Sequence, residues 1–188
     1  VQTGTNLGSI QQGEVINSFR RVREDIIKTA YASYLAELTD KLLDAKQPDP
    51  FLFSQLNQTL EYIHDDKDPE VLSMIYELKM YKRAGFAPVV SACTNCNQKQ
   101  EYYSFSIKEG GFLCRNCLHI DPHAKTLPQN IAKLLYIFFT IDVGRIGNIS
   151  IKQENKQLLR SLIDAYYEQY GGYFIKSKKF LKQLDILR

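Results

Sequence analysis

The sequence predicts a mainly α-helical fold, a bundle of about six helices with a small β ribbon inserted between its two halves. Two observations lead to this prediction. Apolar residues recur every three or four positions through most of the chain, which is the period of one helix face. That period stops once, where four cysteines accompany a run of aromatic and β-branched residues. We expect an N-terminal segment at 1–17 and the first part of the helical domain at 18–86. The ribbon should span 87–124, and the second part of the helical domain 125–188.

The composition is that of an ordinary globular domain that can bury its own core. The chain has 188 residues, of which 44% are hydrophobic and 24% are charged. The longest apolar run, Ile131–Ile141, is interrupted by Lys133 and is too short for a membrane span. A formal net charge of +3 permits contact with nucleic acid but does not require it.

The first residues have a strand-like pattern. Leu7–Ile10 and Glu14–Ile16 are expected to be strands on either side of Gln11–Gly13. An isolated hairpin is marginally stable in water, so these strands need a sheet that the sequence does not supply. Because the chain starts with valine inside this pattern, we expect a fragment whose N-terminal portion is missing.

Three helices are predicted before the ribbon. One apolar stripe from Phe19 to about Leu43 predicts a single long helix. Asp49-Pro50 and Asp68-Pro69 each supply an N-cap followed by proline at the first helical position, which predicts two further helices. The second of these should stop near Gly85.

Three more helices are predicted after the ribbon. Thr126–Gln129 could form a capping box, and Ile131–Phe139 is apolar on nearly all sides, so we expect a central core helix here. A second helix should begin near Ser150–Gln153 and end at Gly171-Gly172, and a last one should run from about Phe174 to Leu187. At core spacing, Tyr34, Tyr166 and Tyr170 are assigned to packing.

The ribbon carries the strongest motif. Cys93 and Cys96 form one C-x-x-C pair, and Cys114 and Cys117 form the other, separated by residues 97 to 113. This spacing is typical of a tetrahedral zinc site built from two knuckles. The intervening residues predict a hairpin, with strands at 102–107 and 112–113 and a turn at Gly110-Gly111. Asn97 stands where a knuckle often needs a left-handed residue.

Other uses of the cysteines are two disulfides or a thiol-redox centre. No signal peptide is recognisable, and the βαβ pattern that usually accompanies a redox C-x-x-C is absent from the sequence. Four thiolates would close the shell of one Zn²⁺, so the expected role is structural. We interpret His119 and His123 as surface residues, because four cysteines suffice.

The sequence contains little that resembles a catalytic centre. It has neither of the common glycine-rich phosphate-binding motifs, and its three histidines have no recognisable spacing with an acid or a nucleophile. The neighbouring acids Glu24-Asp25 and Asp65-Asp66 are interpreted as solvated. We therefore expect that the protein is not an enzyme.

Two basic clusters are candidate nucleic-acid contacts. The first comprises Arg20, Arg21 and Arg23, and the second comprises Lys176, Lys178, Lys179 and Lys182. An ordinary solvated surface explains both clusters. The alternative is a patch that follows a phosphate backbone without sequence choice, with the lysines opposite the apolar stripe of the last helix.

Taken in order, these segments resemble the C-terminal two-thirds of the bacterial recombination mediator RecO. The resemblance rests on Leu7–Ile16, Thr29–Leu38, Leu78–Met80, the ribbon, and Tyr166–Leu181. It covers essentially the whole chain, and the combination of ribbon and flanking helices is much more specific than the ribbon alone.

The resemblance implies a non-enzymatic factor in DNA repair and homologous recombination. Such proteins have an OB-fold domain, a helical domain and often a zinc ribbon, and residues 1–17 would be the remnant of the truncated OB-fold. They bind single- and double-stranded DNA, anneal strands and, with RecR, help load RecA onto DNA coated by the single-stranded-DNA-binding protein SSB. The implied setting is the bacterial cytoplasm, in association with the nucleoid.

The resemblance also implies sites. The zinc ligands would be Cys93, Cys96, Cys114 and Cys117. The SSB tail, an acidic peptide ending in phenylalanine, would bind the helical domain in a hydrophobic groove with Lys or Arg at its rim. Two alternatives remain: a zinc-ribbon adaptor that contacts only proteins, and a thiol oxidoreductase.

Overall fold

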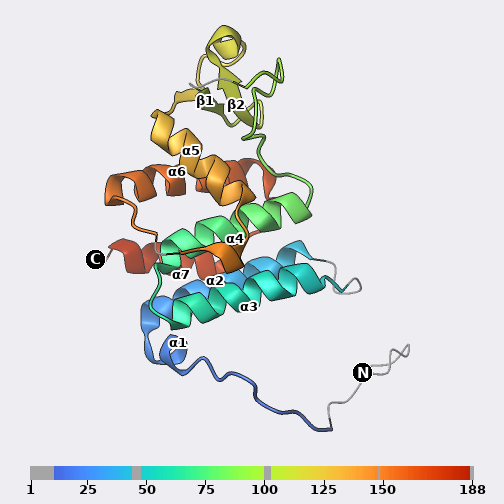
Figure 1. Cartoon of the computed structure of the whole chain (residues 1–188), viewed down its shortest axis with the longest axis vertical. Helices are drawn as coiled ribbons and strands as arrows, with labels where there is room; N and C mark the ends of the chain where they lie inside the picture. Colours follow the sequence, from blue (N-terminus) through green and yellow to red (C-terminus); the bar gives the residue numbers. More distant parts are fainter. Residues whose placement is uncertain (1–10, 44–47, 100–102, 148, 187–188) are drawn as a thin grey trace.

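The computed structural model describes residues 11–43, 48–99, 103–147 and 149–186, and these form layered helices with a β ribbon at one end (Figure 1). The elements are α1 (Arg20–Glu24), α2 (Ile26–Leu42), α3 (Pro50–His64), α4 (Pro69–Arg83), β1 (Tyr103–Ser106), β2 (Gly111–Cys114), η1 (Arg115–Ile120), β3 (Lys125–Thr126), α5 (Gln129–Thr140), η2 (Val143–Arg145), α6 (Gln153–Tyr170) and α7 (Lys176–Ile186), where η1 and η2 are 3₁₀ helices. Within these residues, no helix combines the length and apolarity needed to cross a bilayer. The predicted helical fold with an inserted ribbon is confirmed.

The first predicted helix is wrong in one respect, because two helices replace it. Asp25 is extended (φ −118°, ψ 120°) and separates α1 from α2. Its carboxylate accepts hydrogen bonds from the backbone N–H groups of Ile27 (2.8 Å) and Lys28 (3.1 Å). The aspartate therefore acts as an N-cap inside a continuous apolar stripe.

The expected strand at Glu14–Ile16 does not form. Residues 11–18 contain no strand, and the side chains of Val15 and Ile16 are exposed. No described strand lies beside them to supply hydrogen bonds. The other expected strand, Leu7–Ile10, lies outside the described residues.

Both Asp-Pro predictions are confirmed. The Asp49 carboxylate accepts from Leu52 N–H (3.0 Å), and that of Asp68 accepts from Glu70 N–H (3.0 Å). The prolines occupy the first turns of α3 and α4. Gly85 follows α4 with φ +84°, a left-handed conformation that favours glycine at a helix end.

The central helix is α4, not α5 as the sequence predicted. Every residue from Val71 to Tyr81 is buried, and α4 contacts α2, α3, α5 and α6. On α5 only one face is buried, because Tyr136 and Ile137 remain 45% and 44% exposed. The expected capping box before α5 is also absent: Thr126 lies in β3, and no side chain caps the helix.

The last helix begins slightly later than expected and is capped from α2. The Glu37 carboxylate accepts from the backbone N–H groups of Lys176 (2.9 Å) and Ser177 (2.8 Å). Burial alone would raise the pKa of Glu37, but these bonds and the one from the Ser177 hydroxyl lower it. The cap attaches the C-terminal helix to the first half of the bundle.

Candidate metal centre

A three-stranded antiparallel sheet, with strand order β2-β1-β3, supports the cysteines. The predicted hairpin is confirmed, with Tyr103 opposite Cys114 and Ser106 opposite Gly111. The turn passes through Gly110 and Gly111, both at positive φ. A Cβ on Gly111 would lie 2.2 Å from the carbonyl oxygen of Val89, so the close approach of these two segments requires glycine.

The hairpin contributes side chains to two separate buried clusters. Phe105 and Phe112 face the helical bundle and belong to its core. The adjacent Leu113 and Cys114 belong to a separate small cluster with Cys93 and Cys117. Leu113 points to the face opposite Phe112, and Cys114 ends β2 where the chain passes into η1, so one short hairpin joins the cysteine cluster to the bundle.

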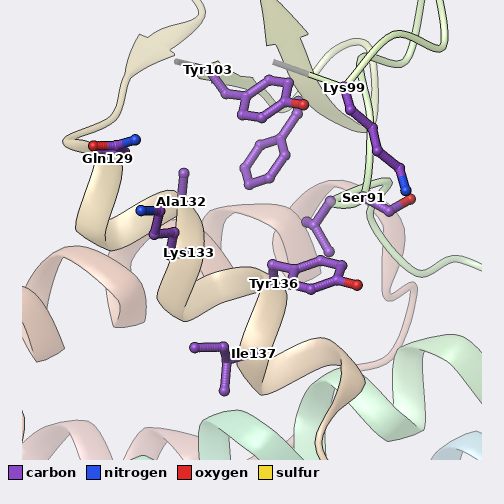
Figure 2. A pocket seen from close by; sticks show the side chains of 10 residues that line it. Ser91, Lys99, Tyr103, Gln129, Ala132, Lys133, Tyr136 and Ile137 are labelled. Carbon is purple, nitrogen blue, oxygen red and sulfur yellow. The ribbon is translucent and has the colours of Figure 1, made fainter. Parts of the chain in front are cut away.

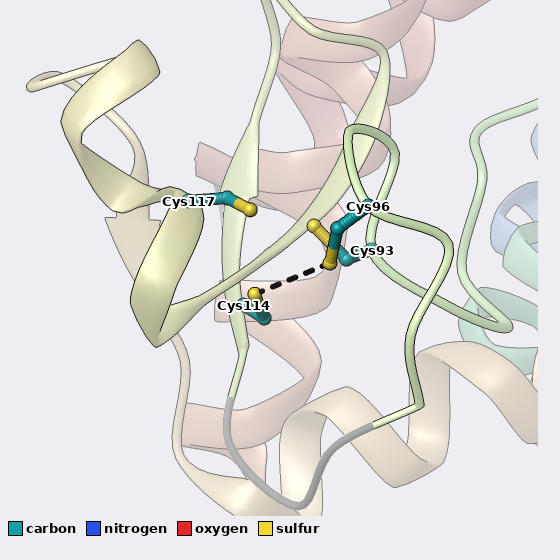
Figure 3. A group of neighbouring side chains, drawn as sticks. All are labelled: Cys93, Cys96, Cys114 and Cys117. Atoms are coloured by element: carbon teal, nitrogen blue, oxygen red, sulfur yellow. Dashed lines mark hydrogen bonds between the residues drawn. The ribbon is translucent and has the colours of Figure 1, made fainter.

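The four cysteine sulfurs converge on one point (Figure 3). All four Sγ atoms lie within 4.8 Å of one another, and those of Cys96 and Cys114 are 3.7 Å apart. A tetrahedral zinc site with Zn–S distances of about 2.3 Å places its sulfurs roughly 3.8 Å apart. A disulfide would need about 2.05 Å, and all four cysteines are free. This arrangement could hold one metal ion.

The first C-x-x-C pair lies in a loop of the predicted type. Asn97 is left-handed (φ 56°), and its N–H donates to the carbonyl of Cys93 (2.9 Å). Thr94 N–H donates to the carbonyl of Phe112 (2.8 Å) and ties this loop to β2. The second pair spans the end of β2 and the 3₁₀ helix η1, which the sequence analysis missed.

The electrostatics of the cluster favour ionisation of one thiol, that of Cys93. Burial raises the pKa of Cys93, but N–H groups of Cys96, Cys114 and Asn95 outweigh it and lower this pKa to about 6. The Asn95 amide favours the Cys117 thiolate, yet burial and the neighbouring sulfurs raise the pKa of Cys117 to about 12. Four adjacent thiols cannot all ionise unless a cation compensates their charge. As predicted, His119 and His123 are exposed and stand outside the cluster.

The structure does not bring the three arginines together. Arg20 pairs with Glu24 (2.7 Å), Arg21 with Asp66 (3.4 Å), and the Arg23 Nε donates to the carbonyl of Ser18 (3.0 Å). Each guanidinium thus has its own partner.

The four lysines of α7 also separate into two kinds. Lys176 and Lys179 are exposed. Lys178 points inward: its Nζ lies 2.9 Å from Asp164 and 5.0 Å from the ring centroid of Tyr167. Lys182 approaches Asp164 and Glu168 at 3.6 Å each. The expected solvated face is therefore wrong for Lys178.

Sequence reasoning missed a groove between the C-terminal ends of α4 and α5, which we call the α4–α5 groove. Its cavity has a volume of about 530 Å³. It is lined by Phe51, Leu52, Lys79, Lys82, Arg83, Phe139, Thr140, Ile141 and Asp142. Only the folded structure brings its cations, all from α4, beside apolar side chains from α3 and from the end of α5.

Comparison with known proteins identifies the family. The family model "Recombination protein O C terminal" matches residues 23–179. The chain belongs to the RecO family. It is 53% identical over 185 residues to the DNA repair protein RecO of Oceanobacillus iheyensis, covering 98% of this chain and 72% of that protein. RecO proteins of Bacillus cytotoxicus and Bacillus mycoides are 45% and 44% identical, each over 75% of their length. The match confirms the family that the sequence was expected to belong to. The structure confirms the helical domain with its four-cysteine cluster.

Proposed function

We propose that this chain is part of a recombination mediator in which a structural zinc ion holds the ribbon. Membership of a DNA repair family, together with four convergent cysteines, carries the proposal. Zinc fits the donor set because four thiolates in tetrahedral spacing suit it and leave no open position for a reacting water. A closed shell of this kind would supply folding energy and no chemistry, and it would leave no reduced thiol pair for oxidoreductase activity.

The ribbon has little else to stabilise its outer part. The cluster around the cysteines contains one fully buried aliphatic side chain, that of Leu113, among the described residues. We therefore expect one zinc per chain by metal analysis. Cys114→Ser should lose the metal and the hydrogen-exchange protection of β1 and β2, whereas His123→Ala should keep both. Four titratable thiols and no metal in the purified, untreated protein would contradict a zinc centre.

The mediator activity proposed for this protein is that of a DNA-binding and loading factor. It binds single- and double-stranded DNA, anneals complementary strands and, with RecR, helps RecA replace SSB. Exposed Lys176 and Lys179 supply positive charge for phosphate contacts. The test is binding to labelled DNA at low salt, followed by strand annealing and RecA loading on SSB-coated DNA with RecR. A protein that binds neither DNA nor the SSB tail would overturn the proposal.

We assign the SSB tail to the α4–α5 groove. An acidic peptide that ends in phenylalanine needs an apolar cavity with cations nearby, and this groove offers Phe139 and Ile141 beside Lys82 and Arg83. Phe51 is 57% exposed at its edge and adds apolar surface. Lys82 stands over the Phe139 ring, 5.5 Å from its centroid.

Charge reversal tests this assignment. Lys82→Glu should weaken binding of a fluorescent tail peptide at least tenfold, because an attraction becomes a repulsion in a partly desolvated groove. Lys152→Glu, at an exposed position before α6, is the matched control and should bind normally. Equal effects of both variants would indicate a general charge effect and no site in this groove.

The adaptor hypothesis remains the second candidate. The many ion pairs of the basic clusters favour it, since Lys178 and Lys182 already have carboxylate partners. An adaptor would bind the SSB tail normally and would show no affinity for DNA.

A further inference from the structure

A second groove lies between the ribbon and α5, and we call it the ribbon groove (Figure 2). Its cavity has a volume of about 540 Å³, within the usual range of ligand sites. It is lined by Val90, Ser91, Lys99, Tyr103, Phe112, Gln129, Ala132, Lys133, Tyr136 and Ile137. Tyr103 also packs against the cysteine cluster, whereas the residues that line the α4–α5 groove are all different.

The walls of the ribbon groove are aromatic. On the ribbon side, Tyr103 and Phe112 are stacked, with ring centroids 4.7 Å apart and an interplanar angle of 14°. On the α5 side, Tyr136 and Ile137 are 45% and 44% exposed, although the opposite face of this helix is packed in the core. Figure 2 shows the Tyr136 ring lying below the Tyr103 ring across the groove. The described residues thus form an aromatic concavity with exposed side chains on its α5 side.

The charged side chains that line the ribbon groove, among the residues the structure describes, are both lysines. Lys99 comes from the ribbon and Lys133 from α5, so one cation stands on each side. Both lysines are exposed, and neither has an ion-pair partner among the described residues. Within the described part of the chain, the residues that line the cavity include no aspartate or glutamate. This combination favours an anionic occupant that also carries flat apolar surfaces.

We propose that the ribbon groove binds single-stranded DNA, with a base against the Tyr136 ring and phosphates beside Lys99 and Lys133. Aromatic faces together with cations that follow a backbone are the usual means of binding single strands without sequence choice. Duplex DNA keeps its bases stacked and paired, so it could use the lysines but not the aromatic concavity. The inference rests on the proposed DNA-binding function and gives it a location.

An acidic peptide is the competing occupant, and the distribution of cations argues against it. In the α4–α5 groove, the cations all come from one helix, α4, and so suit the compact charge of a peptide carboxylate. In the ribbon groove, the cations stand on opposite walls and suit a charge that is repeated along a chain. The same experiment separates the two occupants.

The test measures binding of a fluorescent oligothymidylate to the whole zinc-loaded 188-residue chain at several salt concentrations. Tyr136→Ala should weaken binding at least about fivefold, the lower end for loss of one stacked base, while Tyr136→Phe should bind normally. Lys99→Ala with Lys133→Ala should reduce the slope of log K against log salt by about 1.4, from two lost single-strand phosphate contacts. Lys41→Ala with Lys152→Ala removes two exposed lysines elsewhere and should leave affinity and slope unchanged.

Photo-crosslinking gives an independent readout. An oligonucleotide carrying 5-iodouracil should crosslink to peptides containing Tyr103 or Tyr136. Normal DNA affinity in Tyr136→Ala, with crosslinks elsewhere, would overturn the site and leave the proposed function intact. Loss of SSB-tail binding in Tyr136→Ala, with DNA binding unchanged, would identify the groove as a peptide site. A chain that binds no oligothymidylate but still binds the tail would overturn the inference and favour the adaptor.

Discussion

Glu77 of α4 and Arg160 of α6 form a two-pronged ion pair in the centre of the helical bundle. Glu77 is fully buried, Arg160 Nη1 lies 2.8 Å from its Oε1, and Nη2 contacts its Oε2. Arg160 also lies 2.9 Å from Asp164, which in turn pairs with Lys178 of α7 at 2.9 Å. The network joins three helices, two of which follow the ribbon in sequence.

Arg160→Met should destabilise the fold by about 3–5 kcal/mol, because it leaves the Glu77 carboxylate buried without a counter-charge. Urea denaturation followed by circular dichroism measures the change. Glu77→Leu combined with Arg160→Met removes both charges and should recover most of the loss. A loss below about 1 kcal/mol in the single variant would mean that water reaches Glu77.

Gly111→Ala should weaken the ribbon and its hold on the metal. The new methyl group would meet the Val89 carbonyl, at an expected cost of about 1–3 kcal/mol, as for other overpacked sites. Competition with a chromophoric chelator should show faster zinc loss than in the unmodified protein. Gly147→Ala is the matched control, because no atom of the residues that the structure describes lies within 4 Å of its added Cβ. Equal zinc loss in both variants would rule out a steric role for Gly111.

Lys79 should make stability depend on alkaline pH. Burial lowers its pKa from the model-peptide value of 10.5 to about 8, and its Nζ donates to the Phe139 carbonyl (2.8 Å). Between these pH values the unfolded chain binds more protons than the folded chain. The destabilisation is therefore complete below about pH 8 and disappears as pH rises towards 10.5.

Lys79→Met lacks this titration, so comparing its free energy of unfolding with that of the unmodified protein isolates the effect. The unmodified protein should gain stability relative to the variant between pH 8 and pH 10.5. A difference that stays constant with pH would show that Lys79 keeps its ordinary pKa. The comparison cancels the titration of the buried tyrosines, which both proteins share.

The lysines of α7 should fall into two functional classes. Lys176→Ala with Lys179→Ala removes exposed charge and should reduce the salt dependence of DNA binding without changing stability. Lys178→Ala should instead lower stability, because it leaves Asp164 with fewer counter-charges and uncovers the Tyr167 ring. Thermal unfolding and DNA titration of each variant distinguish the two classes. An unchanged DNA affinity and salt dependence in the first variant would show that Lys176 and Lys179 do not contact DNA.

Local signals accounted for what the sequence predicted well. The Asp-Pro caps at Asp49 and Asp68, the paired cysteines and the left-handed Asn97 each depend on a few neighbouring residues, and all were confirmed. The break at Asp25 was missed because the apolar stripe continues through it. There the Asp25 side chain caps a new helix, although the apolar period alone predicts one continuous helix.

Features that depend on distant residues could not be predicted. The burial of Glu77 and Lys79 in α4 depends on their partners Arg160 and Phe139, which lie far along the chain. The apolar run of α5 indicated a central helix, yet part of it lines the ribbon groove. Two-residue β3 is too short to leave a pattern, and its pairing with β1 exists only in the folded sheet.

The central position of α4 has a consequence for synthesis of the protein. A ribosome finishes α4 well before α5 and α6, which complete its surroundings, and the ribbon has to be made in between. During that interval, nascent α4 would present apolar side chains, as well as Glu77 without Arg160, to solvent or to a chaperone. Fragments cut within the ribbon should accordingly be unstable apart and should reassemble when they are co-expressed.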